Sequence, residues 1–257
     1  MPHNEPVDAC AWLILPTYNE AENIGPIVAA AVQRLGEAAR EHVVLIVDDN
    51  SPDGTGDAAD LLAKTYPSVR VLHRKGKEGL GRAYLAGFEV ALDNGADLVL
   101  EMDADFSHDP RDLGRLIRAA HDDCDLAIGS RYTAGGGVRD WSFARRMLSR
   151  GGCQYARRIL GIDVQDVTGG FKCFRRETLE AIALDKVISN GYGFQIELTY
   201  RTIRAGKTVK EIPIWFTERR AGESKMSPHI AIEAAVRVPG LKRRVDAEFA
   251  GSDPTKR

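Results

Sequence analysis

The chain has 257 residues, of which 44% are hydrophobic and 28% are charged, and its formal net charge is −2. This composition is typical of a folded soluble chain and argues against intrinsic disorder. The near-neutral charge provides no basic field, so we expect no nucleic-acid partner. The length is enough for one large α/β domain with a sizeable core.

Neither a metal–cysteine motif nor a membrane-spanning stretch is visible. The four cysteines form no CxxC pair, which favours scattered reduced thiols over a disulfide framework or a zinc site. The opening residues lack a basic segment and contain only the short apolar run Ala11–Leu15, so we expect no signal peptide. No stretch approaches about 18 apolar residues, so any membrane contact is expected to be peripheral.

In the first half of the chain, short apolar runs alternate with segments of helical periodicity. The expected strands are Trp12–Leu15, Val43–Val47, Val69–Leu72, Leu98–Met102 and Leu126–Gly129. The expected helices are Glu20–Leu35, Asp57–Thr65, Gly81–Asn94 and Pro110–His121. This alternation predicts an α/β fold with a mainly parallel central sheet covered by helices.

The second half is less regular. We expect a helix at Gly193–Ala205, a strand at Thr208–Phe216 and an amphipathic helix at Pro228–Val238. No linker-like stretch divides the chain. We therefore expect one catalytic domain over residues 10–240, followed by a basic and polar tail over residues 241–257.

Polar loops follow four of the expected strands. Their sequences are PTYNE, DDNSPDGT, DADFSH and SRY. In a parallel sheet the carboxyl ends of the strands meet at one edge, and ligands bind beyond that edge. The four loops are therefore expected to converge on one binding site.

The segment DAD places Asp103 and Asp105 two positions apart, on one side of an extended backbone. Two carboxylates this close repel each other unless a positive charge lies beside them. Mg²⁺ suits such a pair, because it takes one or two carboxylates and completes its coordination with water and phosphates; Mn²⁺ also accepts oxygen ligands. The alternative is a solvated loop whose aspartates cap a helix.

The first two loops carry groups that suit a nucleotide. Asp48 and Asp49 lie just past a strand, where their carboxylates can accept hydrogen bonds from a ribose or a base. Tyr18 can stack on a base, whereas Glu20 can serve either the ligand or a helix N-terminus. The alternative for the second loop is a plain turn, because Asp, Asn, Ser and Gly are turn formers.

Seven motifs in order resemble those of the GT-A-fold inverting glycosyltransferases, and in particular the dolichyl-phosphate or polyprenol-phosphate mannose synthases. The motifs are LPTYNEAENI, IVDDNSPDGT, KEGLGRAYLAGF, MDADFSHDP, IGSRY, TGGFKCFRR and AGESKM, which together span most of residues 12–238. Each motif is modest, but the ordered set is specific. The resemblance implies a three-layer GT-A fold, GDP-mannose as donor and a polyprenyl monophosphate as acceptor.

The resemblance also assigns roles to residues. It implies that the donor and acceptor are bound by Pro16, Tyr18, Glu20, Val47, Asp48, Asp49, Asp103, Ala104, Asp105, Arg131, Arg145, Arg219 and Lys225. It implies a divalent metal, Mg²⁺ or Mn²⁺, on Asp105 and Asp103, with Ser107 at a position where some relatives use glutamine. The residues expected to take part in catalysis are Asp105, Arg131, Arg145, Arg219 and Lys225.

The implied reaction requires no general base, because the acceptor phosphate is already anionic at neutral pH. It requires positioning and charge stabilisation, and arginines bind phosphate in a bidentate fork. Inversion at the anomeric carbon would give a β-linked mannosyl phosphate. There are two alternatives to this function. In one, the same fold uses another donor such as UDP-glucose; in the other, the protein is a catalytically silent relative that binds a nucleotide sugar.

A lipid acceptor implies contact with a membrane. The segment Pro228–Val245 has an apolar face and a basic end, so it can lie at a membrane surface or pack against the domain. We expect a cytoplasmic protein, peripheral at the cytoplasmic face of the membrane. A membrane-anchored partner protein or domain is also expected.

Overall fold

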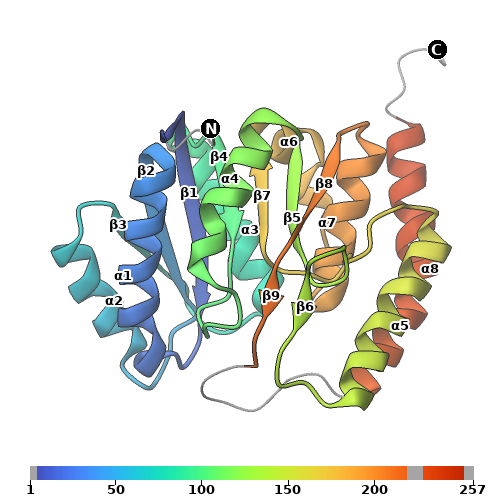
Figure 1. The fold of residues 1–257 in the computed structure, drawn as a ribbon, viewed down its shortest axis with the longest axis horizontal. Helices are drawn as coiled ribbons and strands as arrows, with labels where there is room; N and C mark the ends of the chain where they lie inside the picture. The colour runs from blue at the N-terminus through green and yellow to red at the C-terminus, as the bar shows by residue number, and fades with distance from the viewer. Residues whose placement is uncertain (1–4, 219–227, 252–257) are drawn as a thin grey trace.

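A seven-stranded sheet forms the centre of the molecule, in the order β3-β2-β1-β4-β7-β5-β8 (Figure 1). The computed structural model describes residues 5–218 and 228–251, with side chains from residue 237 onward in the second range. The strands of the sheet are β1 (Val7–Thr17), β2 (Ala39–Asp48), β3 (Val69–His73), β4 (Leu98–Glu101), β5 (Leu126–Ser130), β7 (Lys172–Arg175) and β8 (Val209–Pro213). All neighbours are parallel except β7, which is antiparallel to β4 and β5. The predicted mainly parallel sheet is confirmed.

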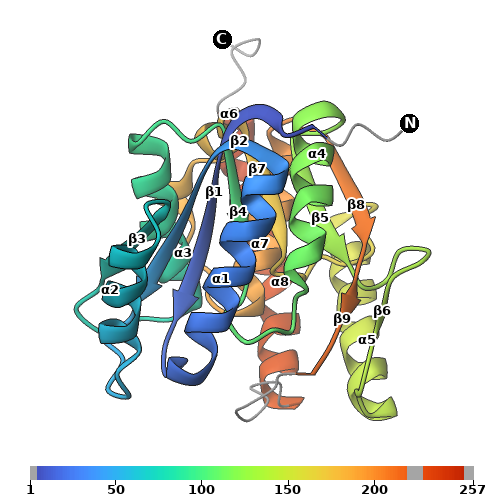
Figure 2. The ribbon, with the colours of Figure 1, turned by 60° about the vertical axis from the view of Figure 1, so that its left-hand side comes forward.

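Helices cover both faces of the sheet, so the molecule has three layers (Figure 2). One face carries α1 (Ala21–Ala38), α2 (Thr55–Thr65) and α4 (Leu113–Asp122), which follows a short 3-10 turn at Pro110–Asp112. The other face carries α3 (Leu80–Asp93), α5 (Phe143–Leu160), α6 (Arg176–Ala181), α7 (Tyr192–Arg204) and α8 (Pro228–Ala250). A second 3-10 turn, Leu184–Lys186, precedes α7.

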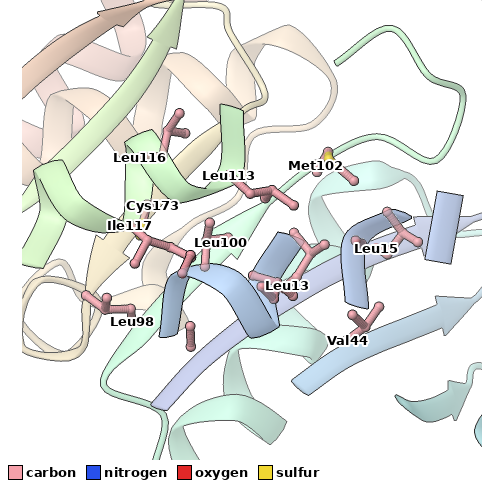
Figure 3. Packing of buried hydrophobic residues seen from close by; sticks show 14 of the residues in the cluster. Leu13, Leu15, Val44, Leu98, Leu100, Met102, Leu113, Leu116, Ile117 and Cys173 are labelled. Atoms are coloured by element: carbon pink, nitrogen blue, oxygen red, sulfur yellow. The ribbon is translucent and has the colours of Figure 1, made fainter. Parts of the chain in front are cut away.

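Alternation along β1 divides the core into two halves. Leu13 and Leu15 pack with α1 and α4 on one face (Figure 3), whereas Trp12 and Ile14 pack on the other. All four are almost completely buried. Successive side chains of a strand point to opposite faces, so a strand covered on both sides has a nearly continuous run of apolar residues. Each such side chain contributes about 1.5–3 kcal/mol of hydrophobic stabilisation.

The expected strand Thr208–Phe216 is divided in two. Its first part is β8, which pairs with β5. Its second part is β9 (Trp215–Phe216), which leaves the sheet and pairs with β6 (Gly137–Val138). The loop between β5 and β6 folds back tightly on the end of β5: a Cβ on Gly136 would lie 2.4 Å from the Ser130 carbonyl oxygen. This crossing brings β9 to the carboxyl end of β5.

Helix α8 continues past residue 240, where a polar tail was expected. Leu241 and Val245 are buried against the domain, and the Lys242 Nζ donates to the Ile159 carbonyl at 2.9 Å. Asp246 accepts from the Tyr200 hydroxyl at 2.6 Å. The residues from 241 to 250 are therefore a packed helix and not a tail, because their apolar residues recur at helical spacing. Over the described ranges, no helix has both the length and the apolar character needed to cross a bilayer.

The contact between α3 and β1 gives a test of the packing. A Cβ on Gly87 would lie 2.4 Å from Cγ2 of Ile14, whereas a Cβ on Gly151 in α5 would meet nothing within 4 Å. We expect Gly87→Ala to lower the free energy of unfolding by about 1–3 kcal/mol through overpacking. Gly151→Ala should raise it by about 0.5–1 kcal/mol, because alanine is the better helix former. Urea unfolding of both variants measures this, and equal effects would contradict the packing.

Candidate active site

The polar loops predicted to converge do meet at one edge of the sheet. Strand β1 points toward this edge, the lower one in Figure 1, where α5 also begins. The β1–β2 register places Pro16 beside Val47 and Thr17 beside Asp48. The edge is therefore built from the ends of neighbouring parallel strands, as expected for an α/β ligand site.

The first two loops are held together by hydrogen bonds. The amide of Asn19 donates to Ser51 Oγ at 3.1 Å, and the amide of Glu20 donates to Thr55 Oγ1 at 2.9 Å. Asn19 and Asn50 adopt positive φ angles of 61° and 58°, which asparagine tolerates better than most residues. These bonds give both loops a defined shape before any ligand binds.

The two aspartates that follow β2 have different partners. The Asp48 carboxylate accepts from the Thr17 hydroxyl at 3.2 Å and from the amide and hydroxyl of Ser51 at 3.1 and 2.6 Å. Its Oδ2 also lies 4.0 Å from Nδ1 of His73 at the end of β3. Asp49 pairs with Arg74 at 2.5 Å. Burial raises the pKa of Asp49 despite the opposing charge of Arg74.

Tyr18 and Glu20 also have partners within the chain. The Lys77 ammonium lies 3.9 Å from the centre of the Tyr18 ring, so a cation rests on the face expected to stack on a base. Glu20 accepts from the side chain of Asn23 in the first turn of α1 at 2.9 Å. Neither Arg74 nor Lys77 was among the predicted site residues. The sequence feature that could have indicated them is the basic, glycine-rich segment after β3, which contains both.

The DAD segment directly follows β4, and its charges act on a buried side chain of α3. Burial raises the pKa of the Tyr84 hydroxyl on α3 well above its usual value, and the charges of Asp103, Glu101 and Asp105 raise it further. Ala104, between the two aspartates, packs into the core of the opposite face. The predicted metal site on Asp103 and Asp105 stays a prediction.

The residues around Asp105 fit a divalent metal that also binds phosphates. Asp105 accepts from the Ser107 amide at 3.0 Å. The Ser107 hydroxyl is buried, and no group in the described part of the chain makes a hydrogen bond to it. Within that part, no three His, Cys, Asp or Glu side chains converge as a closed metal cage. Mg²⁺ commonly uses one or two carboxylates and takes its other ligands from water and substrate phosphates.

His108 is buried next to the aspartates but is packed between aromatic rings. Its ring centre lies 5.0 Å from that of Phe171 and 5.1 Å from that of Phe216. Its Nδ1 lies 4.0 Å from Asp103 Oδ2. This environment makes His108 a packing residue beside the site.

Arg131 lies at the edge of the sheet but is fully engaged with Asp166. Its Nε and NH2 each lie 2.6 Å from a different oxygen of that carboxylate, and NH2 also donates to Thr168 at 2.8 Å. Both charged groups are buried. Burial alone would lower the pKa of Arg131, but Asp166 raises it, so the pair remains ionised. Asp166 is therefore the partner of this arginine.

Arg145 lies in the first turn of α5 and has a more exposed guanidinium. Its NH1 pairs with Glu218 at 2.6 Å, and its Cζ lies 4.1 Å from the ring centre of Trp141. Trp141 was not among the predicted site residues; its signal was an aromatic residue inside a basic, glycine-rich segment. The predicted Arg219 and Lys225 lie outside the described residues.

A buried charge pair underlies the carboxylates. Lys172 opens β7 directly opposite Glu101, and its Nζ donates to the carbonyl and side-chain oxygens of Gln195 at 2.9 and 2.5 Å. Burial raises the pKa of Glu101 to about 7 and lowers that of Lys172 to about 8, and each charge partly opposes the shift of the other. Sequence reasoning missed this pair, because the register of β4 against β7 cannot be seen from either motif alone.

The fold and this site define a glycosyltransferase. Residues 12–183 match the family model described as glycosyl transferase family 2, so the chain belongs to that family.

Curated relatives of known name are similar over almost the whole chain. An undecaprenyl-phosphate mannosyltransferase of Micrococcus luteus is 51% identical over 225 residues, which cover 88% of this chain and 90% of that protein. A polyprenol monophosphomannose synthase of Mycolicibacterium smegmatis is 49% identical over 237 residues, which cover 91% of this chain and 88% of that protein.

Solved structures confirm the GT-A fold class. A glucosyl-3-phosphoglycerate synthase from Mycobacterium tuberculosis, in complex with Mn²⁺, UDP and glucosyl-3-phosphoglycerate, superimposes with a TM-score of 0.66. The match covers 92% of this chain and 80% of that one at 18% identity. At this identity the likeness concerns the fold.

The buried pair beneath the site gives a prediction for stability. Lys172→Met should lower the free energy of unfolding by about 1–3 kcal/mol at pH 8, because it removes the nearby positive charge that favours the ionised form of the buried Glu101. The double variant Glu101→Leu, Lys172→Met should recover most of this loss. Denaturant unfolding of both variants measures the difference. If the double variant were as unstable as the single one, the loss would come from packing and not from charge.

The pH dependence of Glu101 follows from its raised pKa. Between its unfolded value of 4.5 and about 7, the folded state binds the proton more tightly. Stability contributed by this group is therefore present below pH 4.5 and is lost as the pH rises toward 7. Relative to the wild type, Glu101→Gln should gain stability across this window. Unfolding curves at pH 5 and pH 7 measure the change, and a constant difference would contradict it.

Proposed function

We propose that this protein transfers mannose from GDP-mannose to a polyprenyl monophosphate with inversion, giving a polyprenyl β-mannosyl phosphate. The observation that carries the proposal is the identity of 49–51% to two enzymes named for this type of transfer, over about nine tenths of each chain. The site supports it, because carboxylates for a metal-bound diphosphate and arginines for a phosphate lie at one sheet edge.

Asp105, Asp103 and Ser107 are proposed to hold Mg²⁺ or Mn²⁺ against the diphosphate of the donor. The metal, when bound, neutralises the negative charge that develops on the leaving nucleoside diphosphate. Support comes from the charges of both carboxylates acting on the same buried Tyr84 hydroxyl and from the buried Ser107 hydroxyl, which has no hydrogen bond in the described part of the chain. The enzyme of the same fold from M. tuberculosis is named as a complex with Mn²⁺ and UDP.

The nucleoside is proposed to lie over the first two loops. Pro16 and Val47 form neighbouring positions at the ends of β1 and β2, beside the Asp49–Arg74 pair. Asp49 supplies carboxylate acceptors for a ribose or a base, and Tyr18 supplies a ring. Ala104 turns its side chain into the core, so its backbone is what the donor meets.

The acceptor phosphate is proposed to approach from the side of α5. It carries its own negative charge, so no side chain has to remove a proton before it attacks the anomeric carbon. The packing of His108 between two aromatic rings fits a site without a histidine base. Arg145, with Arg219 and Lys225 from the same chain, is proposed to orient this phosphate, since a guanidinium binds phosphate in a fork.

Two alternative functions predict different results in a transfer assay. With UDP-glucose as donor, the same carboxylates would hold the metal; the M. tuberculosis enzyme of the same fold is named as a complex with UDP. A silent nucleotide-sugar-binding protein would bind the donor without transfer.

The transfer assay distinguishes these proposals. Purified protein receives radiolabelled GDP-mannose or UDP-glucose, a polyprenyl phosphate and Mg²⁺ or Mn²⁺, and label is followed into the organic phase. We expect mannose transfer that EDTA abolishes. Asp105→Asn should reduce it by roughly 10²–10³-fold, the effect of removing one preorganised electrostatic group. The anomeric carbon–hydrogen coupling of the product reports inversion.

Asp93→Asn is the matched control, because Asp93 is exposed at the end of α3, away from the site edge. It should transfer mannose like the wild type. If label were transferred from UDP-glucose and not from GDP-mannose, the donor would be UDP-glucose. If the protein bound a donor but transferred no sugar, it would be a non-catalytic nucleotide-sugar-binding protein.

We further propose that the protein works at the cytoplasmic face of a membrane as a peripheral protein, with a membrane-anchored partner protein or domain. Helix α5 supports this. It contains five arginines and no acidic residue, and Phe143 and Met147 are 76% and 54% exposed near its start. Apolar side chains beside arginines suit an anionic lipid surface. The described part of α8, in contrast, packs its basic end inward, with Arg244 paired to Glu197 at 2.7 Å.

Vesicle binding tests this surface. The double variant Phe143→Ser, Met147→Ser should bind vesicles containing anionic lipid at least roughly tenfold more weakly, because two apolar side chains no longer enter the lipid. Co-sedimentation measures the binding. Leu61→Ser, at a residue 64% exposed on α2, is the control and should bind normally. Equal binding by all three proteins would exclude α5 as the contact.

A further inference from the structure

We propose that Trp141 is a positioning residue of this site: its indole ring holds the guanidinium of Arg145 in the orientation that binds a phosphate monoester. This inference rests on the proposed function, in which that monoester is the headgroup of the acceptor.

Trp141 provides a fixed face for the arginine. It lies between β6 and α5 and is only 5% exposed. The ring of Phe216 in β9 meets it edge-on, at 5.4 Å between centres and 76° between planes. Arg145 Cζ lies 4.1 Å from the Trp141 ring centre. A cation–π contact shielded from water is strong enough to set the orientation of an arginine.

Arg145 needs such support because of where it lies. It is in the first turn of α5, where the helix dipole disfavours a positive charge. Its partner Glu218 holds only NH1 and is itself 44% exposed, so water weakens this pair. Among the described residues, the face of Trp141 is the other contact that orients the guanidinium.

Stacking leaves the edge of the guanidinium available. Arg145 Nε is buried, but the side chain as a whole is 19% exposed, and its NH1 reaches the exposed carboxylate of Glu218. The NH1 end of the guanidinium is therefore the part that a phosphate can reach. A phosphate monoester carries more negative charge than Glu218, so it can take over NH1 from that carboxylate.

Arg131 shows why the support matters at this position. Its Cζ also lies near Trp141, at 5.7 Å from the ring centre, but its charge is matched by Asp166. Among the two described arginines of the site, Arg145 is the one held by a ring and an exposed carboxylate. It is therefore the one that an incoming anion can recruit.

Equilibrium binding tests the proposal without depending on turnover. The probe is a short-chain prenyl monophosphate, and the wild type is compared with Trp141→Leu and Trp141→Phe. We expect Trp141→Leu to raise Kd roughly ten- to thirtyfold, the size of a desolvated cation–π contact. Trp141→Phe, which keeps an aromatic face, should recover most of the affinity. Kd for GDP-mannose should change less than twofold in both variants.

Two further variants keep the test decisive. Trp215→Leu is the matched control, because Arg139 Cζ lies 5.1 Å from its ring but Trp215 is 48% exposed; it should bind the probe normally. Glu218→Gln, at an exposed position, should lower Kd up to about fivefold by removing the competing carboxylate.

Three results would overturn the role of Trp141. They are equal losses in the Leu and Phe variants, a parallel loss of GDP-mannose affinity, and a failure of the wild type to bind the probe. A wild type that binds the probe with the expected order of variants, yet transfers no mannose, would leave the positioning role standing and refute the proposed function.

Discussion

The crowding of three carboxylates at the end of β4 is the constraint on which the rest of the site depends. Glu101 ends the strand, Asp103 and Asp105 follow it at alternate positions, and the charges of all three raise the pKa of the buried Tyr84 hydroxyl. Like charges this close need compensation. The fold supplies it for the innermost carboxylate by inserting β7 antiparallel, which places Lys172 opposite Glu101. For the outer two, Asp103 and Asp105, we propose that a divalent cation supplies this compensation.

The positive side of the site is divided between two kinds of arginine. Arg131 is buried and matched by a bidentate carboxylate, so it fixes the geometry of the loop after β5. Arg145 pairs only with the exposed carboxylate of Glu218, and the ring of Trp141 fixes its orientation without neutralising its charge. This division follows from burial, because a buried charge must be paired, whereas an exposed one can exchange its partner for a ligand.

The local sequence was informative wherever a strand was buried on both faces. Trp12–Leu15 and Val43–Val47 lie within observed strands, because a continuous apolar run between turn formers has few other stable outcomes. The pair Asp103 and Asp105 was found for the same reason, since alternation along a chain is a local property. Trp141 and Lys172 were missed, because their partners come from distant segments.

The sequence by itself determined the layered α/β fold, the edge at which ligands bind and the acidic loops at that edge. All of these follow from short-range periodicity and from the geometry of parallel strands. Only the tertiary structure decided that Asp166 neutralises Arg131, that Lys172 lies opposite Glu101 and that residues 241–250 pack as a helix. Such pairings depend on strand order and register, and these are set by the burial of the whole chain and not by any one segment.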